Sequence, residues 1–279
     1  MNACERDLLL NAQQQYKFKL YNFEDCVALI DVGKLRCDQE DSLLVSKKFG
    51  NTLMLVADGM GGLEDGAFAS RMAAIDTYEW FQSLQKSKFD NIDNLSEEYE
   101  KFIEELDIKI RNNCDGGTTL LIAIELNNFI LIFNIGDSRA YIYNELCELS
   151  QVTRDQSITQ ELYENGDISC KDYMRFHKKN NLICSRLGCS KKLLTVETQL
   201  LPKEGINDLF LFTDGVTDCI SDDTLFDFIY NNDGVISRQI LEYIMTHNSY
   251  FNIPSDDYYD VIEAGKDNIS IIHKKIRRK

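Results

Sequence analysis

Acidic residues stand in this sequence at the points where short apolar runs begin or end. The clearest case is Asp58, which follows the run LMLV and precedes Gly59, Met60, Gly61 and Gly62. Asp and Gly are common turn residues, so one interpretation is a simple glycine-rich turn. The other is a metal site, because a glycine backbone can approach an ion without steric conflict. This stretch alone leaves both interpretations open.

Four more acidic clusters share this setting. They occupy residues 36–42, 136–139, 214–218 and 266–268, each next to an apolar run. One Asp at a strand end is ordinary, but five such clusters are expected to converge if the strands pack together. Converging carboxylates resist ionisation unless a cation lies between them, and Mg²⁺ or Mn²⁺ prefers oxygen ligands. The pattern therefore favours a divalent-metal centre.

Short runs rich in Ile, Leu, Val and Phe must position these carboxylates, and such runs are typical of strands. We predict strands at residues 26–30, 42–46, 52–57, 118–125, 129–135, 140–143, 209–213 and 269–273. The segment LLIAIELNNFILIFNI predicts a hairpin that turns at Asn127 and Asn128, where Asn tolerates the left-handed region.

Helical periodicity predicts two long helices, at residues 65–84 and 95–111. The apolar face of the first consists of Phe68, Met72 and Ile75. The apolar face of the second consists of Leu95, Tyr99, Phe102, Leu106 and Ile110. Shorter helices are predicted at 222–230 and 235–246. Runs of strands with paired helices between them favour an α+β fold with antiparallel sheets over a doubly wound fold.

The composition limits the class of protein. Of the 279 residues, 44% are hydrophobic, enough for a sizeable core, and we expect a single domain over residues 1–279. No apolar run is long enough to span a membrane, and the N-terminus lacks the pattern of a signal peptide. The nine cysteines form no C-x-x-C pair, so we expect reduced thiols and a cytoplasmic location. The net charge of −16 argues against nucleic-acid binding.

Seven stretches, in order, carry a resemblance to a known family: DVGKLRCDQEDS, VADGMGG, GGTTLLIAI, NIGDSRAYIY, VTRDQSITQEL, LFTDGVTD and KDNISII. They run from Asp31 to Ile272 and resemble the metal-dependent protein serine/threonine phosphatases of the protein phosphatase 2C type (PPM family). The D-G-M-G-G form resembles the bacterial branch. The resemblance implies a four-layer α/β/β/α sandwich of two antiparallel sheets flanked by helix pairs. Its motif-bearing core would cover about residues 23–274, with the metal site in a cleft at one end.

The resemblance implies a site with two Mn²⁺ or Mg²⁺ ions. Asp58 would bridge both ions, and Asp214 and Asp267 would hold the first. Glu40 and the carbonyl of Gly59 would serve the second, largely through waters. A hydroxide that bridges the ions would attack phosphorus in line, without a phosphoenzyme intermediate.

Three further residues match the family around these ligands. Arg36 matches the phosphate-binding arginine, whose guanidinium fork suits phosphate oxygens; the alternative is a surface salt bridge. Asp41 and Asn268 match residues that support the ligands from outside, although Asp41 could merely end a turn. We expect Thr118 and Thr119 to serve packing and turn chemistry rather than catalysis.

Many bacterial members of the family hold a third metal ion. The residues that match its ligands are Asp137, Asp214 and Asp218. The alternative for Asp137 is an interior structural role in which it pairs with Arg139.

The resemblance implies hydrolysis of phosphoserine and phosphothreonine in proteins, in opposition to a Ser/Thr kinase. The partners would be phosphorylated proteins, such as a cognate kinase or its targets, and we expect a monomer. Met60 stands where many eukaryotic members carry a His, so a metal-bound water would supply the proton to the leaving group. One rival is a relative that only binds a kinase, although such relatives usually lose the metal-site acids retained here. The other is a phosphoesterase that acts on small phosphates.

The chain departs from the family pattern in two stretches, and the resemblance does not cover the segment before Phe23. Residues 153–190 match the family's flap beside the cleft, but their second half is looser and lacks the usual Pro after His177, which bears on substrate choice. Residues 248–264 are longer and more acidic and aromatic, and would form a partner surface or a solvated loop. The basic tail at 273–279 would contact an acidic partner or lipid, or be a frayed end.

Overall fold

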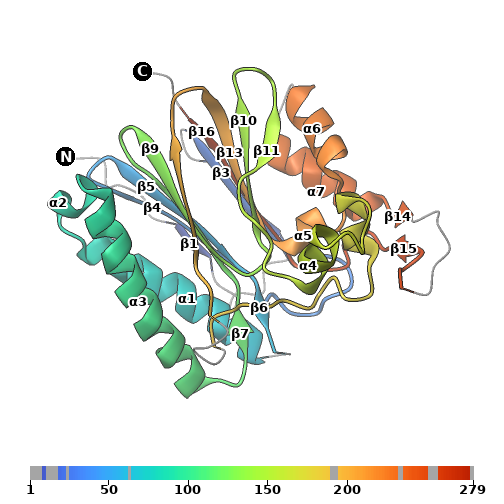
Figure 1. Cartoon of the computed structure of the whole chain (residues 1–279), viewed down its shortest axis with the longest axis horizontal. Helices are drawn as coiled ribbons and strands as arrows, with labels where there is room; N and C mark the ends of the chain where they lie inside the picture. The colour runs from blue at the N-terminus through green and yellow to red at the C-terminus, as the bar shows by residue number, and fades with distance from the viewer. Residues whose placement is uncertain are drawn as a thin grey trace.

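The eight predicted strands all form in the computed structural model (Figure 1), and the stretch predicted at 118–125 is interrupted at Thr119. The structure describes residues 8–10, 18–22, 25–61, 64–188, 194–231, 235–250 and 257–276. Part of the 248–264 stretch and the last three residues of the basic tail lie outside the described residues.

Two six-stranded sheets form the centre of the molecule, and every pairing within them is antiparallel. The first sheet has the order β1 (Leu8–Leu10), β4 (Ser42–Lys48), β5 (Asn51–Ala57), β8 (Leu120–Glu125), β9 (Phe129–Ile135) and β12 (Glu197–Pro202). The second has the order β11 (Leu149–Gln151), β10 (Arg139–Asn144), β13 (Ile206–Phe212), β16 (Ile269–Lys275), β3 (Cys26–Asp31) and β2 (Phe18–Asn22). The predicted α+β class with antiparallel sheets is confirmed.

Two short antiparallel strand pairs lie outside the two main sheets. One joins β6 (Gly59–Met60) to β7 (Gly117–Thr118), and the other joins β14 (Ser249–Tyr250) to β15 (Val261–Ile262). The turn between β8 and β9 lies where it was predicted. Its expected left-handed backbone was wrong, because Phe49 and Cys147 are the described non-glycine residues with positive φ.

The sheets pack face to face, which explains why their central strands are continuous apolar runs. Along β5, Met54 and Val56 point to the core between the sheets, whereas Leu53 and Leu55 point to the core under the helices. A strand buried on both faces needs apolar side chains at every position, and each residue of β5 is buried.

Helices cover both outer faces (Figure 1). On the first sheet lie α1 (Glu64–Ser83), α2 (Lys86–Phe89) and α3 (Ile92–Asn113). On the second lie α5 (Asp214–Thr217), α6 (Asp222–Tyr230) and α7 (Ile236–Thr246). The stretch 153–188 contains α4 (Ile158–Glu164) and the 3₁₀ helix η1 (Lys171–Phe176). None of the described helices has the length and apolar character needed to cross a membrane.

The predicted apolar face of α1 is wrong at Phe68 and only partly right at Met72, which packs against the core. Phe68 is 39% exposed, and Met72 and Ile75 are only half-buried. The side of α1 that faces the sheet instead carries Ala69, Ala73 and other small residues, which let the helix axis lie close to β4 and β5. Periodicity located the helix, but large apolar residues did not mark the buried side.

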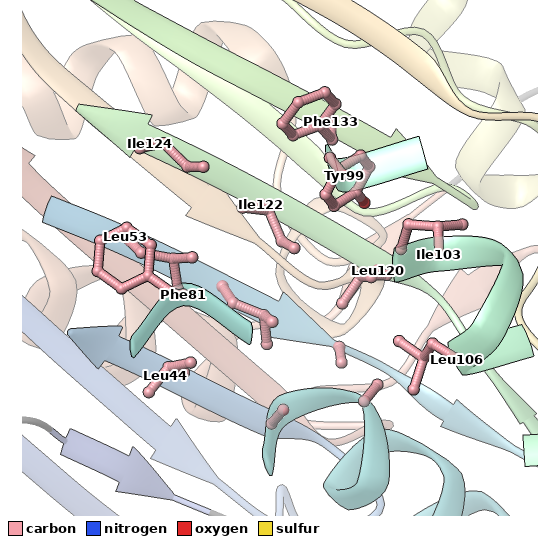
Figure 2. Packing of buried hydrophobic residues seen from close by; sticks show 14 of the residues in the cluster. Leu44, Leu53, Phe81, Tyr99, Ile103, Leu106, Leu120, Ile122, Ile124 and Phe133 are labelled. Atoms are coloured by element: carbon pink, nitrogen blue, oxygen red, sulfur yellow. The ribbon is translucent and has the colours of Figure 1, made fainter. Parts of the chain in front are cut away.

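The predicted apolar face of α3 is confirmed at most positions. Leu95, Tyr99, Leu106 and Ile110 are buried, whereas Phe102 is half-buried and its neighbour Ile103 takes the inward position. Figure 2 shows this face against the sheet, with Tyr99 lying over Phe133.

The Tyr99 hydroxyl is a weakness in this core. The side chain is fully buried, its ring centroid lies 3.7 Å from that of Phe133, and no described group hydrogen-bonds its hydroxyl. Since an unpaired buried hydroxyl destabilises a fold, Tyr99→Phe is expected to raise the free energy of unfolding by about 1 kcal/mol. Urea unfolding of the variant would measure this.

Tyr141→Phe is the matched control for that prediction. Tyr141 is equally buried, but its hydroxyl donates a hydrogen bond to Asp222 Oδ1 at 2.7 Å. The same substitution there is expected to lower the free energy of unfolding by about 1 kcal/mol. A loss of stability in both variants would contradict the view that the Tyr99 hydroxyl is unpaired.

Candidate metal centre

The strand register brings the predicted carboxylates to one end of both sheets. The first residue of β4 pairs with the last of β5, so Asp41 and Asp58 lie side by side at the strand ends. The last residue of β13 pairs with a residue near the start of β16 and with the first residue of β10. Asp214, Asp267 and Asp137 therefore emerge at the corresponding end of the second sheet.

Threonines hold the backbone of Asp58. The Asp58 N–H donates to Thr119 Oγ1 at 2.9 Å, and the Thr119 N–H donates back to the Asp58 carbonyl at 2.9 Å. Thr118 Oγ1 donates to the same carbonyl at 3.0 Å. These contacts fix the direction in which Asp58 leaves β5, and they are the turn role expected for the two threonines.

Gly59 is required by close packing. A Cβ at this position would lie 2.2 Å from the carbonyl oxygen of Gly66 in α1 and 2.6 Å from that of Glu40. Any side chain would therefore separate α1 and the Glu40 loop from the end of β5. This explains the glycine without reference to an ion, and the ligand role of its carbonyl stays a prediction.

Asp41 and Asn268 support the centre from behind. Asp41 is 1% exposed, and its Oδ2 accepts hydrogen bonds from Ser270 Oγ at 2.7 Å and Thr213 Oγ1 at 2.9 Å. Asn268 accepts from the Glu40 N–H at 2.8 Å through Oδ1, and its amide group donates to two carbonyls of the same loop. Asp41 is thus more than the end of a turn.

Arg36 lies at the rim of the centre. Its side chain is 49% exposed, and Nη2 lies 2.8 Å from Asp267 Oδ2. Hydrogen bonding to Asp267 raises the pKa of Arg36. The salt bridge considered from the sequence is therefore present, and it pairs Arg36 with a predicted metal ligand.

The structure does not support the pairing considered between Asp137 and Arg139. Arg139 Nε and Nη2 instead form a fork with the buried carboxylate of Asp155, at 2.9 and 2.6 Å. Asp137 lies with Asp155, Asp214 and Asp218 around a cavity of about 10 Å³, room for about one water. Sequence reasoning missed the role of Asp155, although the family-like stretch TRDQS contains it.

The carboxylates oppose one another's ionisation. Burial, and then the charges of Asp214, Asp41 and Asp267, raise the pKa of Asp58 well above its ordinary value. Burial is also the main cause that raises the pKa of Asp41 to about 8 and that of Asp214 to about 7. Burial and neighbouring carboxylates likewise raise the pKa of Asp137. A divalent cation would relieve this repulsion.

The donors present fit a hard cation. Glu40 Oε1, Asp41 Oδ1 and Asp214 Oδ1 are buried without a hydrogen-bond partner among the described residues. Within the same residues no three acidic, His or Cys side chains are already arranged as a metal site. Arg36 already engages Asp267, so ion binding by Asp267 would have to replace this contact.

These pKa shifts predict how stability depends on pH. Since the pKa values of Asp41 and Asp214 are raised from 3.8 in the folded state, their contribution is full at low pH and is lost as pH rises through 7 and 8. Unfolding of EDTA-treated protein should become easier from pH 6 to 8.5, by up to about 1.4 kcal/mol per pH unit for each proton released. Mg²⁺ should reverse the trend, and Asp214→Asn should flatten it. A stability that does not change with pH in EDTA would contradict the clustering.

A cavity much larger than the small acidic one lies elsewhere. It measures about 880 Å³ and lies between α6 and α7, lined by Phe228, Tyr243 and neighbours but by none of the predicted site residues. A second cavity of about 390 Å³ adjoins the carboxylates, because Arg139, Arg175 and Thr217 line both it and the small acidic cavity. The chemistry of the side chains, rather than cavity size, therefore identifies the centre.

Known proteins share this arrangement of sequence and fold. The family model described as protein phosphatase 2C matches residues 34–239. The serine/threonine phosphatase stp of Listeria welshimeri is 29% identical over 248 residues, covering 87% of this chain and 92% of the relative. Protein phosphatase PhpP of Streptococcus pneumoniae is 28% identical over 210 residues, covering 72% and 82%.

A solved structure shows the same fold. The serine/threonine phosphatase Stp1 from Staphylococcus aureus superposes with a TM-score of 0.74 at 20% identity, covering 96% of this chain and 98% of that one. At this identity the likeness concerns the fold alone. The family match covers most of the chain, and the carboxylates that carried the resemblance converge at one end of the sheets. The chain belongs to the protein phosphatase 2C family, and its enzyme class is that of a protein phosphatase.

Proposed function

We propose that this protein hydrolyses phosphoserine and phosphothreonine in proteins at a centre of two Mn²⁺ or Mg²⁺ ions. The observation that supports it most is the convergence of Asp58, Asp214 and Asp267 from two sheets, with buried carboxylate oxygens left unpaired. The family match gives the reaction class. A four-layer α/β/β/α sandwich, acting as a single domain, would hold this centre.

The residues divide the work of holding the ions. Asp58 would contact both ions, Asp214 and Asp267 would hold the first, and Glu40 with the Gly59 carbonyl would hold the second. When bound, the ions lower the pKa of a water so that it becomes a nucleophile near neutral pH. No side chain need form a covalent bond to phosphorus, so hydrolysis would be direct.

The surrounding residues position these ligands. Asn268 fixes the backbone of Glu40, and Thr118 with Thr119 fixes that of Asp58. Ser270 and Thr213 hold Asp41 close to Asp58 and Asp214, so its carboxylate, once ionised, would favour cation binding. Removal of such a supporting contact typically weakens metal binding by about 10–100-fold.

Arg36 would bind the phosphate of the substrate. Its guanidinium is half-exposed at the rim, and it becomes available when Asp267 turns to an ion. Arg36→Ala is therefore expected to raise KM for a phosphothreonine peptide by about tenfold, since a charge-assisted fork is lost. Arg36→Lys should recover only part of this loss, because a point charge does not reproduce the fork.

The stability of the Arg36→Ala variant distinguishes phosphate binding by Arg36 from a surface salt bridge. A half-exposed ion pair contributes about 1 kcal/mol at most, so Arg36→Ala should barely change the urea midpoint in EDTA. An unchanged KM in the Arg36→Ala variant would contradict phosphate binding and leave only the salt bridge.

Hydrolysis of a phosphothreonine peptide tests the proposed function. Wild-type protein is assayed with Mn²⁺, with Mg²⁺ and with EDTA, and in parallel on small phosphorylated metabolites. Turnover of the peptide that requires the ion and exceeds that of the metabolites is expected. Preference for the metabolites would indicate a small-molecule phosphoesterase, and folded protein without turnover would indicate a binding-only relative.

A further inference from the structure

Asp218 is held by two donors on a single oxygen. Lys266 Nζ lies 2.7 Å from Asp218 Oδ2, and Asn180 Nδ2 donates to the same atom at 2.8 Å. Asp218 follows α5, Lys266 precedes β16, and Asn180 belongs to the 153–188 stretch. Three distant parts of the chain therefore meet at one carboxylate.

Lys266 is a fixed cation in this position. Its side chain is 28% exposed and that of Asp218 is 14% exposed, so water screens the pair only partly. An ammonium group 2.7 Å from a carboxylate and partly open to water is stabilised in its charged form.

This contact changes what Asp218 can offer to an ion. A carboxylate oxygen accepts two hydrogen bonds through its two lone pairs, and the Oδ2 atom of Asp218 already accepts two. Lys266 also balances the charge of Asp218. Of the three carboxylates predicted to hold a third ion, one thus already faces a cation before any metal binds.

We propose that Lys266 is a resident cation of the centre, which balances Asp218 in place of a third metal ion and weakens metal binding at that position. The inference rests on the two-ion centre proposed above and concerns the Asp218 side of it alone. A merely structural salt bridge between α5 and β16 would leave metal binding unchanged when the ammonium is removed.

Counting bound Mn²⁺ tests the inference. Lys266→Met keeps most of the apolar stem but removes the charge, and Lys266→Arg keeps the charge. Metal-depleted proteins are titrated with Mn²⁺ by calorimetry, and bound Mn²⁺ is counted by elemental analysis after gel filtration at fixed free Mn²⁺. At this free Mn²⁺ concentration, wild type and Lys266→Arg should bind two ions and Lys266→Met three. The dissociation constant for the third Mn²⁺ should be lower in Lys266→Met than in wild type by at least about tenfold.

Two controls connect the effect to this contact. Lys171→Met removes an ammonium of similar exposure, 32%, that pairs with Asp222 in the neighbouring cavity, and it should leave the Mn²⁺ count unchanged. The double variant Lys266→Met with Asp218→Asn should lose the third ion again, because the carboxylate that Lys266 releases is then absent.

The outcomes separate this inference from the proposed function. Two ions bound by wild type, with an identical titration for Lys266→Met, would overturn the inference alone. A third ion bound equally tightly by wild type and Lys266→Met would overturn it too. Folded wild-type protein that binds no Mn²⁺ would contradict the two-ion centre and this inference with it.

Discussion

Replacement of Asp58 by Asn is expected to lower kcat/KM for a phosphothreonine peptide by about 10³-fold or more, equivalent to about 4 kcal/mol of transition-state stabilisation. Asp58 is the carboxylate that would contact both ions, and the charges of Asp214, Asp41 and Asp267 all act on it. An amide has one neutral carbonyl oxygen and cannot balance two cations. Initial rates at saturating Mn²⁺ would measure the loss.

The same substitution is expected to stabilise the metal-free protein. Removing one of several buried carboxylates relieves the repulsion among them. In EDTA at pH 8 the free energy of unfolding of Asp58→Asn should therefore exceed that of wild type by about 1 kcal/mol or more. Added Mn²⁺ should raise the melting temperature of wild type and hardly that of the variant. A variant that is less stable than wild type in EDTA would contradict the crowding of carboxylates.

Asp76→Asn is the matched control. Asp76 lies on α1, away from the centre, and pairs with the half-exposed Lys109 at 2.7 Å. The same Asp-to-Asn change there should leave activity and the response to Mn²⁺ unaltered. Comparable losses of activity in both variants would mean that Asp58→Asn acts through general disruption of the fold.

Removal of the Lys274 charge is expected to have the largest effect on stability. Lys274 lies on β16 and is only 2% exposed. Its Nζ lies 2.6 Å from Asp25 Oδ2 and 3.1 Å from Glu125 Oε2, at the end of the sandwich remote from the metal centre. Glu125 belongs to the first sheet and Lys274 to the second, so this ammonium joins the two sheets.

Lys274→Met should lower the free energy of unfolding by about 3 kcal/mol, because two largely buried carboxylates lose the cation between them. Lys47 and Lys203 also contact these carboxylates, at 3.6 and 2.5 Å, and they limit the loss. Urea unfolding at pH 7.5 would measure it, with Lys275→Met, an exposed neighbour, as the control.

The mechanism predicts a partial rescue. Adding Glu125→Gln to Lys274→Met removes one of the stranded charges and should recover about 1 kcal/mol or more. A loss below about 0.5 kcal/mol in Lys274→Met would show that the buried ion network contributes little.

Local signals in the sequence located the strands and the carboxylates at their ends. The apolar run before Asp58 and the one before Asp214 each predicted a strand that ends in an acidic residue, and β5 and β13 end there. Strand register places these strand ends at the same edge of the two sheets. Register depends on pairings between residues far apart in the chain, and the family resemblance supplied what periodicity could not.

Other features depended on tertiary contacts and left no local signal. Lys274 follows an apolar strand pattern, and nothing nearby in the sequence indicates that Asp25 and Glu125 surround it. In the sequence, Lys266 is only the first residue of a motif, whereas in the structure its ammonium group contacts Asp218. The buried face of α1 was mispredicted because close helix–sheet packing selected alanines over larger apolar residues.

Residues 257–259 of the acidic and aromatic stretch at 248–264 contact the end of η1. Tyr258 forms a β-bridge with His177, the Lys178 N–H donates to the Asp257 carbonyl at 2.9 Å, and the Tyr259 N–H donates to the Phe176 carbonyl at 2.8 Å. This part of the stretch is therefore not a purely solvated loop.

Anomalous diffraction at the manganese edge, from crystals grown with Mn²⁺, would locate the ions themselves. We expect two peaks at this end of the sheets, both in contact with the carboxylate of Asp58, one of them also in contact with Asp214 and Asp267. Arg36 should then be released from Asp267. Mn²⁺ bound elsewhere, or at this end without contact to Asp58, would contradict the two-ion centre.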